Sequence, residues 1–322
     1  GLTGLFMSLP AILVYARISS LFPGKNLYEI LRIVFGGFAG RGLMALYTFY
    51  SFHLGALVLR NFGEFIRSAV MTDSPLMFSV LAATLVCILV CRSGIEVLGR
   101  GAVYALPLLF AITGTVMILG ISQYDLAHLQ PVMGGGLIRI LKGGFMAFSF
   151  PYAETLLFLG SFCLLKDKRS PFRIYLGGIA IGGIVITLVT LMNSLVLGEM
   201  YSLTSFPSYT ALSIISVGWF AERFEITVSF TYFVGIFIKG SICLISTCKG
   251  LSEIFGLNSY RSAIVPVGLL MAWFAYDLYA DTAKMHDWAN YAYHWYALPF
   301  QVIIPLILWI TAEIRLRRGL KV

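Results

Sequence analysis

The sequence predicts an all-α integral membrane protein. Of its 322 residues, 59% are hydrophobic and only 12% are charged, and the mean hydropathy is +0.87. Soluble domains carry roughly 25% charged residues, so a soluble core could not hide this much apolar surface from water. The sequence has no series of ten-residue segments with alternating hydrophobicity, which favours helices over a membrane β-barrel.

Runs of about 20 mainly apolar residues mark the membrane spans. We predict nine transmembrane helices joined by short polar connectors, at 1–22, 40–66, 76–92, 96–121, 137–165, 172–198, 224–250, 262–280 and 296–315. No stretch between them is long enough for a separate soluble domain. The chain is therefore predicted to be one transmembrane domain over residues 1–322.

The distribution of charge predicts how these spans are oriented. If the first span ends in the cytoplasm, 16 of the 23 Lys and Arg residues lie in cytoplasmic segments and six lie on the opposite side. This asymmetry follows the positive-inside rule and explains the net charge of +8 without a nucleic-acid partner. No signal peptide is visible, and because the chain opens with Gly1 directly at a span, we expect an N-terminal segment to be missing.

The second span carries a polar stripe made of His53, Arg60, Glu64 and Arg67. At about 100° per residue, the last three lie within about 40° of His53 around the helix. Two interpretations of Arg60, Glu64 and Arg67 stay open, an ion-pair cluster at the interface or the lining of a vestibule. His53 alone is either a satisfied core histidine or a proton carrier.

The cysteines are predicted to be buried, reduced thiols. Cys87 and Cys91 share one face of the third span, but no His or second Cys pair lies close in sequence to complete a zinc site. We therefore expect no metal. Ser/His/Asp, P-loop and dinucleotide patterns are absent, so nothing indicates an enzyme or a cofactor.

The fifth span contains a proline and an acid at its centre, in the sequence FSFPYAE (148–154). Pro151 removes a backbone donor and clashes with the preceding turn, so we expect the helix to open near Ala147 and Phe148. Broken helices of this kind form substrate sites in transporters, whereas a tolerated kink is the structural alternative. Glu154 favours a site, because ionisable groups inside a membrane are costly and usually functional.

The seventh span offers a partner for Glu154. Lys239 is its only charge near mid-membrane, and at 1.5 Å per residue it lies at a depth similar to that of Glu154. Thr231, Gly235 and Lys239 recur every four residues and share one face, where glycine lets a ligand or another backbone approach. The alternative is that Lys239 snorkels to the inner interface.

Two further features complete the reading of the spans. Asn193, late in the sixth span, is predicted to make a hydrogen bond between helices. The aromatic run WANYAYHWYALPF (288–300) is predicted to be an interfacial belt before the last span.

Several stretches carry a family resemblance. They are LFPGKNLYEI (21–30), NFGEFIRSAVMTDSP (61–75), FPYAE (150–154), the span with Lys239, and PLILWITAEIRLRR (305–318). With these, the whole chain resembles the B subunit of spore germinant receptors, a family within the amino acid/polyamine/organocation transporter superfamily. The resemblance implies a LeuT-like inverted-repeat bundle of ten spans, of which nine are present. Residues 1–136 would hold four spans of the first repeat, without its first helix, and residues 137–322 the five spans of the second.

The resemblance also implies a function and a site. The protein would sense a small nutrient, typically an amino acid, in the spore inner membrane (a bacterial cytoplasmic membrane), and would trigger germination with an A subunit and a lipoprotein C subunit. Two alternatives stay open, a proton-coupled amino acid permease and a subunit that lines a ligand-gated ion path. The ligand site would be lined by Phe148, Ser149, Phe150, Pro151, Tyr152, Glu154, His53, Ala56, Leu57, Arg60, Thr231, Tyr232 and Gly235, with Glu154 and Lys239 as candidates for ion or proton coupling.

Overall fold

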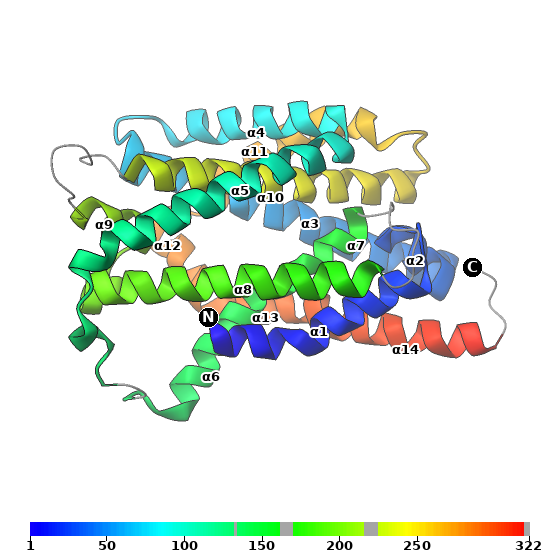
Figure 1. Cartoon of the computed structure of the whole chain (residues 1–322). Helices are drawn as coiled ribbons and strands as arrows, with labels where there is room; N and C mark the ends of the chain where they lie inside the picture. Colours follow the sequence, from blue (N-terminus) through cyan, green and yellow to red (C-terminus); the bar gives the residue numbers. More distant parts are fainter. Residues whose placement is uncertain (132–133, 162–169, 216–224, 319–322) are drawn as a thin grey trace.

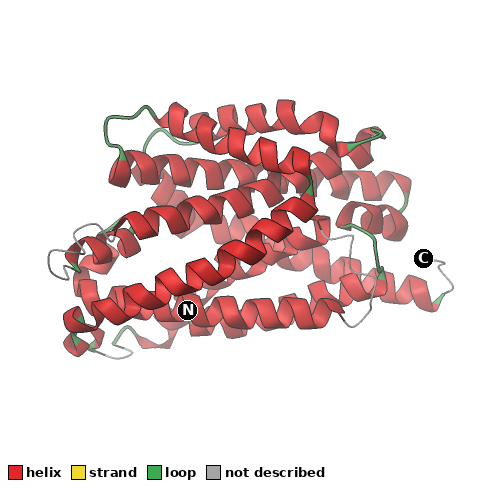
Figure 2. Ribbon diagram, turned by 45° about the horizontal axis from the view of Figure 1, so that its top comes forward, coloured by secondary structure: helices red, strands yellow, loops and turns green. Residues whose placement is uncertain are grey.

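The computed structural model describes residues 1–131, 134–161, 170–215 and 225–318, and every regular element in these ranges is helical. Figure 2 shows helices joined by short connections. Seven helices of the described ranges are long and apolar enough to span a membrane: Leu2–Leu21, Gly37–Val70, Leu76–Ser93, Ile95–Gln123, Ser170–Ser202, Thr227–Phe255 and Thr282–Arg317. The prediction of an all-α integral membrane protein is confirmed.

The helices that match seven of the predicted spans are labelled in Figure 1. They are α1 (Leu2–Leu21), α3 (Gly37–Phe65) with the turn η1 (Ile66–Val70), α4 (Leu76–Ser93), α5 (Ile95–Leu119) with η2 (Gly120–Gln123), α8 (Ser170–Leu197) with η6 (Gly198–Ser202), α10 (Glu225–Phe255) and α14 (Ile304–Arg317). The eighth predicted span is shorter than expected, because α11 (Ile264–Asp277) has only 14 residues, preceded by the turn η7 (Tyr260–Ala263). The turn η3 (Leu126–Leu129) and the helix α9 (Pro207–Ile214) lie in connections.

The fifth predicted span is broken, as its proline and acid indicated. It consists of α6 (Gly136–Ala147), two irregular turns, η4 (Phe148–Tyr152) and η5 (Ala153–Leu156), and the short helix α7 (Leu157–Ser161). Its predicted end, 162–165, and the first residue of the predicted seventh span, Phe224, lie outside the described residues.

The segment after α1 is a buried helix and not the polar connector that we expected. The helix α2 (Leu27–Phe35) begins with a capping box, in which Asn26 accepts from the backbone N–H of Glu29 and Glu29 accepts from that of Asn26. One face of α2 is buried, and the Tyr28 hydroxyl lies 2.9 Å from Ser246 Oγ of α10. The Asn-x-x-Glu spacing is the sequence signal that predicts such a helix start.

The last span begins far earlier than predicted. A continuous helical rod runs from Thr282 to Arg317 through α12 (Thr282–Asp287), η8 (Trp288–Ala292), α13 (Tyr293–Leu298), η9 (Pro299–Ile303) and α14. The aromatic run therefore lies inside this rod, and the prediction of an interfacial belt is wrong for Tyr293, which is buried. Trp295 and Tyr291 on the same rod remain exposed.

The centre of the bundle is formed by α3 and α10. The two helices pack along each other, and α3 also contacts α2, α4 and α11. In Figure 1 the helices α4, α5, α10 and α11 lie on one side of the bundle, and α1, α8, α13 and α14 lie on the other. On α5, by contrast, only 6% of the apolar window is buried, so this helix offers most of its surface to the surroundings.

Candidate functional site

The break in the fifth span is centred on Phe150. Its backbone is extended (φ −137°, ψ 116°) between helical residues on both sides, and Pro151 follows it. Gln301 of the rod partners the opened backbone here, donating from Nε2 to the carbonyl of Ser149 over 2.9 Å while Ser149 Oγ donates to Gln301 Oε1 over 3.2 Å. Backbone groups inside a membrane need such partners, because no water reaches them there.

Glu154 lies four residues beyond this opening and points into the protein. Its side chain is 4% exposed, and its two oxygens have different partners. Lys239 Nζ of α10 donates to Oε2, and the hydroxyl of Tyr293 donates to Oε1. The structure thus joins the broken span, α10 and the rod at one carboxylate. A buried charge is tolerated when it is paired and hydrogen-bonded in this way.

Lys239 lies at the open edge of this group. Its side chain is 28% exposed, and Nζ lies 4.2 Å from the centre of the Phe150 ring, within the range of a cation–π interaction. One turn earlier on α10, Gly235 is exposed, and a Cβ built there would meet nothing within 4 Å. Lys239 and Gly235 therefore share a face of α10 on which Lys239 is partly exposed and Gly235 is exposed.

The other two residues predicted on α10 have partners of their own. Thr231 Oγ1 donates to the carbonyl of Thr227 one turn earlier. Tyr232 stacks on Phe65 of α3, with ring centres 4.3 Å apart, and meets Phe206 edge-on. Tyr232 thus belongs to an aromatic cluster, and its ring contacts do not include the Glu154 group. Tyr152, in the break itself, is buried.

His53 is a core histidine with a partner in the rod. Its Nδ1 lies 3.0 Å from the hydroxyl of Tyr296, and its ring packs between Phe49, Phe274 and Trp288. Nearby on α3, Ala56 is buried and Leu57 is half-buried against the core.

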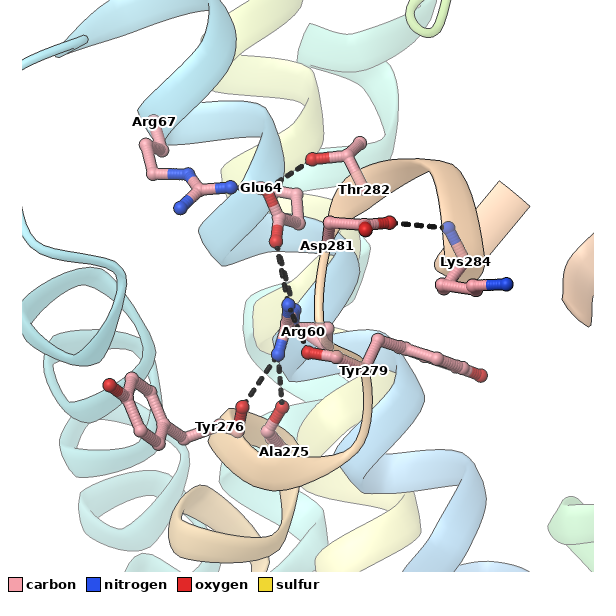
Figure 3. A network of polar contacts seen from close by, with 9 residues as sticks. All are labelled: Arg60, Glu64, Arg67, Ala275, Tyr276, Tyr279, Asp281, Thr282 and Lys284. Atoms are coloured by element: carbon pink, nitrogen blue, oxygen red, sulfur yellow. Dashed lines mark hydrogen bonds and ion pairs between the residues drawn. The ribbon is translucent and has the colours of Figure 1, made fainter. Parts of the chain in front are cut away.

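Arg60 does not reach the Glu154 group. Its guanidinium donates to Glu64 and to the backbone carbonyls of Ala275, Tyr276 and Tyr279, at the connection between α11 and α12 (Figure 3). Of the two interpretations of the polar stripe, the ion-pair cluster describes Arg60, Glu64 and Arg67. Within the protein this cluster is mostly buried, because the Arg60 and Glu64 side chains are 3% and 0% exposed, whereas Arg67 is 41% exposed. The placement of Arg60 in the ligand lining has no support from these contacts.

Tyr293 and Gln301 are the site residues that the sequence interpretation missed. Tyr293, Tyr296 and Phe300 follow one another at helical spacing, i, i+3 and i+7, which indicates one face of a helix. Gln301 is a polar side chain within a predicted span, the kind of residue that usually has a partner inside the bundle. These signals indicate that the two residues face the interior of the bundle, but not that they face the break.

Other predicted polar features are also placed. Asn193 Nδ2 of α8 donates to Ser208 Oγ of α9 over 2.9 Å, which confirms the predicted hydrogen bond between helices. Cys87, Cys91, Cys243 and Cys248 are buried free thiols, and Cys163 lies outside the described residues. Within those residues, no three His, Cys, Asp or Glu side chains come together as a metal site.

A separate cavity lies elsewhere in the described residues. It measures about 540 Å³ between α1 and the rod, and it is lined mainly by apolar side chains, among them Phe148, together with Gln301 and the charged Arg17. It touches the start of the break but not Glu154 or Lys239. We place the candidate site at the charged group and not in this cavity, because only the former combines buried charge with a chain break.

Comparisons with known proteins agree with the resemblance. A family model described as spore germination protein matches residues 2–281. Spore germination protein KB of Bacillus subtilis (strain 168) is 27% identical over 322 residues, covering 98% of this chain and 86% of the relative. Spore germination protein B2 of the same organism is 23% identical over 311 residues, covering 92% and 80%, and spore germination protein XB of Bacillus anthracis is 23% identical over 224 residues, covering 68% and 61%. The chain belongs to the spore germination protein family, and it is an integral membrane member of it.

Proposed function

We propose that this protein is the nutrient-sensing subunit of a spore germinant receptor and binds an amino acid at the break in the fifth span. The observation that carries the proposal is the ion pair between Glu154 and Lys239, which joins the broken segment to α10. Family membership supports the role in germination. The partial exposure of Lys239, and the open space at Gly235 one turn away, support the binding of a ligand there.

An amino acid carries both charges of this pair. Its carboxylate would bind Lys239, and its ammonium would bind Glu154 next to the face of the Phe150 ring. Such an exchange leaves no charge unpaired, whereas opening the pair alone would leave a buried carboxylate without its cation, which is strongly unfavourable. An uncharged sugar offers no such replacement, so the site is expected to prefer a zwitterion.

Binding would signal through a shift between two conformations. A ligand shifts such an equilibrium only by its difference in affinity for the two states. Exchange of the partners of Glu154 and Lys239 would supply that difference in affinity. In the ligand-free state the two side chains bind each other and connect the break to α10, whereas in the bound state each binds the ligand. The response would pass to an A subunit and a lipoprotein C subunit in the spore inner membrane and lead to germination.

The test replaces each partner and measures the nutrient response. Spores carrying Glu154→Gln or Lys239→Gln are exposed to each of the twenty amino acids and to glucose, and the fall in optical density gives the half-response concentration. We expect this concentration to rise at least about tenfold in both variants, since each loses one charge-assisted contact to the ligand. Lys142→Gln is the matched control, because Lys142 is exposed on α6 of the same span.

Two results would contradict the proposal. One is a normal amino acid response in both variants when immunoblots show unchanged protein levels. The other is a response to glucose alone in the unaltered spores, since glucose cannot replace an ion pair.

A proton-coupled permease is the second candidate, favoured by the same buried carboxylate. Acidic residues inside a membrane form proton relays in pumps and transporters. Uptake of labelled amino acid into liposomes containing the protein, driven by a pH gradient, separates the two functions. Robust uptake that Glu154→Gln abolishes would favour the permease.

A further inference from the structure

Arg60, on the neighbouring helix α3, caps the C-terminal end of α11. The last carbonyls of any helix lack partners within it, and a cation near them is favourable. Arg60 Nη1 of α3 donates to the carbonyls of Ala275 (3.3 Å) and Tyr276 (2.6 Å), and Nη2 donates to that of Tyr279 (2.8 Å). Figure 3 shows the guanidinium inside the turn that these carbonyls form. Arg60 thus provides partners for carbonyls at the end of α11.

Glu64 holds the other side of the same turn. Its Oε1 accepts from Arg60 Nε (3.0 Å), and its Oε2 accepts from Arg67 Nη2 and from the hydroxyl of Thr282 (both 2.8 Å). Thr282 is the first residue of α12, which Asp281 caps by accepting from the backbone N–H of Lys284. We call Arg60, Glu64 and Thr282 the α3 clamp. Through these residues, α3 is hydrogen-bonded both to the end of α11 and to the start of the rod.

Tyr293, whose hydroxyl donates to Glu154, lies on the rod that the clamp holds. Eleven residues separate Thr282 from Tyr293, roughly 16 Å at 1.5 Å per residue. The wide turn η8 (Trp288–Ala292) lies between them, and such π-helical turns are rare and change the phase of the helix after them. The clamp fixes the rod before this turn, and the contact of Tyr296 with His53 fixes it afterwards, again on α3.

We propose that Arg60 and Glu64 are positioning residues, which hold the rod at the height and rotation that bring the Tyr293 hydroxyl to Glu154. This inference rests on the proposed function for its biological meaning, because it assigns the clamp to the nutrient site. It also gives the buried Arg60–Glu64 pair a role, although neither residue contacts the proposed ligand site. The clamp acts over a distance through one rigid element and touches no ligand.

The experiment is a double-mutant cycle on the purified full-length protein. Thermal unfolding is measured for Arg60→Lys, Tyr293→Phe and the double variant. Lysine keeps the charge but cannot make the forked contacts of arginine. If the clamp places Tyr293, Arg60→Lys already weakens the contact with Glu154. The drop in Tm caused by Tyr293→Phe should then shrink by at least half in the Arg60→Lys background.

A purely structural role predicts the opposite result. Arg60 and Tyr293 share no partner among the described contacts, so independent effects would add. Additive Tm losses would overturn the inference. Glu64→Gln should couple to Tyr293→Phe as Arg60→Lys does. It replaces Arg60→Lys in the cycle if the arginine variant does not accumulate. Lys284→Gln is the control, because Lys284 is exposed on α12 and enters the network through its backbone N–H.

The nutrient response separates this inference from the proposed function. If Glu154→Gln and Lys239→Gln leave germination unchanged while the Tm cycle shows coupling, the proposed function fails and the clamp stands. If those variants impair germination and the Tm losses add, the clamp fails and the site stands.

Discussion

At the scale of single residues, the side-chain amide of Gln301 replaces hydrogen-bond partners that the backbone loses at the break. Besides its two bonds to Ser149, its Nε2 donates to the hydroxyl of Tyr50 over 2.9 Å, and the residue is fully buried. The Tyr15 hydroxyl in turn donates to the carbonyls of Gln301 and Ala153, so a second side chain ties the rod to the break. An opened helix therefore persists inside the bilayer because specific side chains replace its missing ladder.

We predict that Gln301→Leu destabilises the protein by about 2–4 kcal/mol, because it leaves the buried hydroxyl and carbonyl of Ser149 without the amide and removes one partner of the Tyr50 hydroxyl. Leucine is close in size to glutamine, so a cavity contributes little to this loss. Thermal unfolding of the purified protein measures it. Gln123→Leu is the control, since Gln123 is exposed at the end of η2. Equal stability of the two variants would show that the amide does not hold the break.

At the scale of elements, α1 and α6 approach each other through glycines just before the break. A Cβ on Gly144 would lie 2.7 Å from Thr3 Cγ2, and a Cβ on Gly4 would lie 2.6 Å from Ala147 Cβ. Small residues allow this close approach of helices in membranes. The contact holds α6 against α1 at the point where the chain leaves the helix, so it helps to fix the position of Phe148.

We predict that Gly144→Val destabilises the protein by about 1–3 kcal/mol and that Gly143→Val does not, beyond the change in helix propensity that both share. A Cβ on Gly143 meets nothing within 4 Å, although the two residues are neighbours on the same helix. Thermal unfolding of both variants provides the comparison. A similar loss in both would mean that α1 and α6 are not in close contact.

At the scale of the whole molecule, the bundle has one basic end. The turn between α4 and α5, the helix α2 and the end of α14 lie toward the same end in Figure 1, and Arg17, Arg32, Arg92, Arg315 and Arg317 belong to these or neighbouring segments. The positive-inside rule predicts that this end faces the cytoplasm. The opposite end then carries the turn between α3 and α4 and the α3 clamp.

Cysteine labelling tests this orientation. We expect an impermeant maleimide to label Thr72→Cys, in the exposed turn after α3, in intact bacterial cells. It should label Ser93→Cys, exposed at the end of α4, only after the membrane is permeabilised. The unaltered chain gives the background. The reverse pattern would invert the topology and place the clamp on the cytoplasmic side.

Composition and local pattern alone determined the membrane class, seven of the nine predicted spans and the opening of the fifth span beside Pro151, because these follow from hydropathy and from proline chemistry over short stretches. The opening was expected near Ala147 and Phe148, whereas the structure centres it on Phe150. The division into two inverted repeats, 1–136 and 137–322, stays a prediction. The membrane depth estimated from residue positions also indicated Lys239 as a partner for Glu154, since two charges at one level of a bilayer have few other partners.

Only the tertiary structure decided which other side chains meet there. Tyr293 and Gln301 reach the break because the rod begins at Thr282 and passes through two wide turns, which hydropathy does not reveal. Arg60 shares its helix face with His53, but it turns to the carbonyls at the end of α11, and the place where that helix stops depends on the packing around it. Local sequence sets where helices form, whereas the contacts between them depend on the relative height and rotation of whole elements.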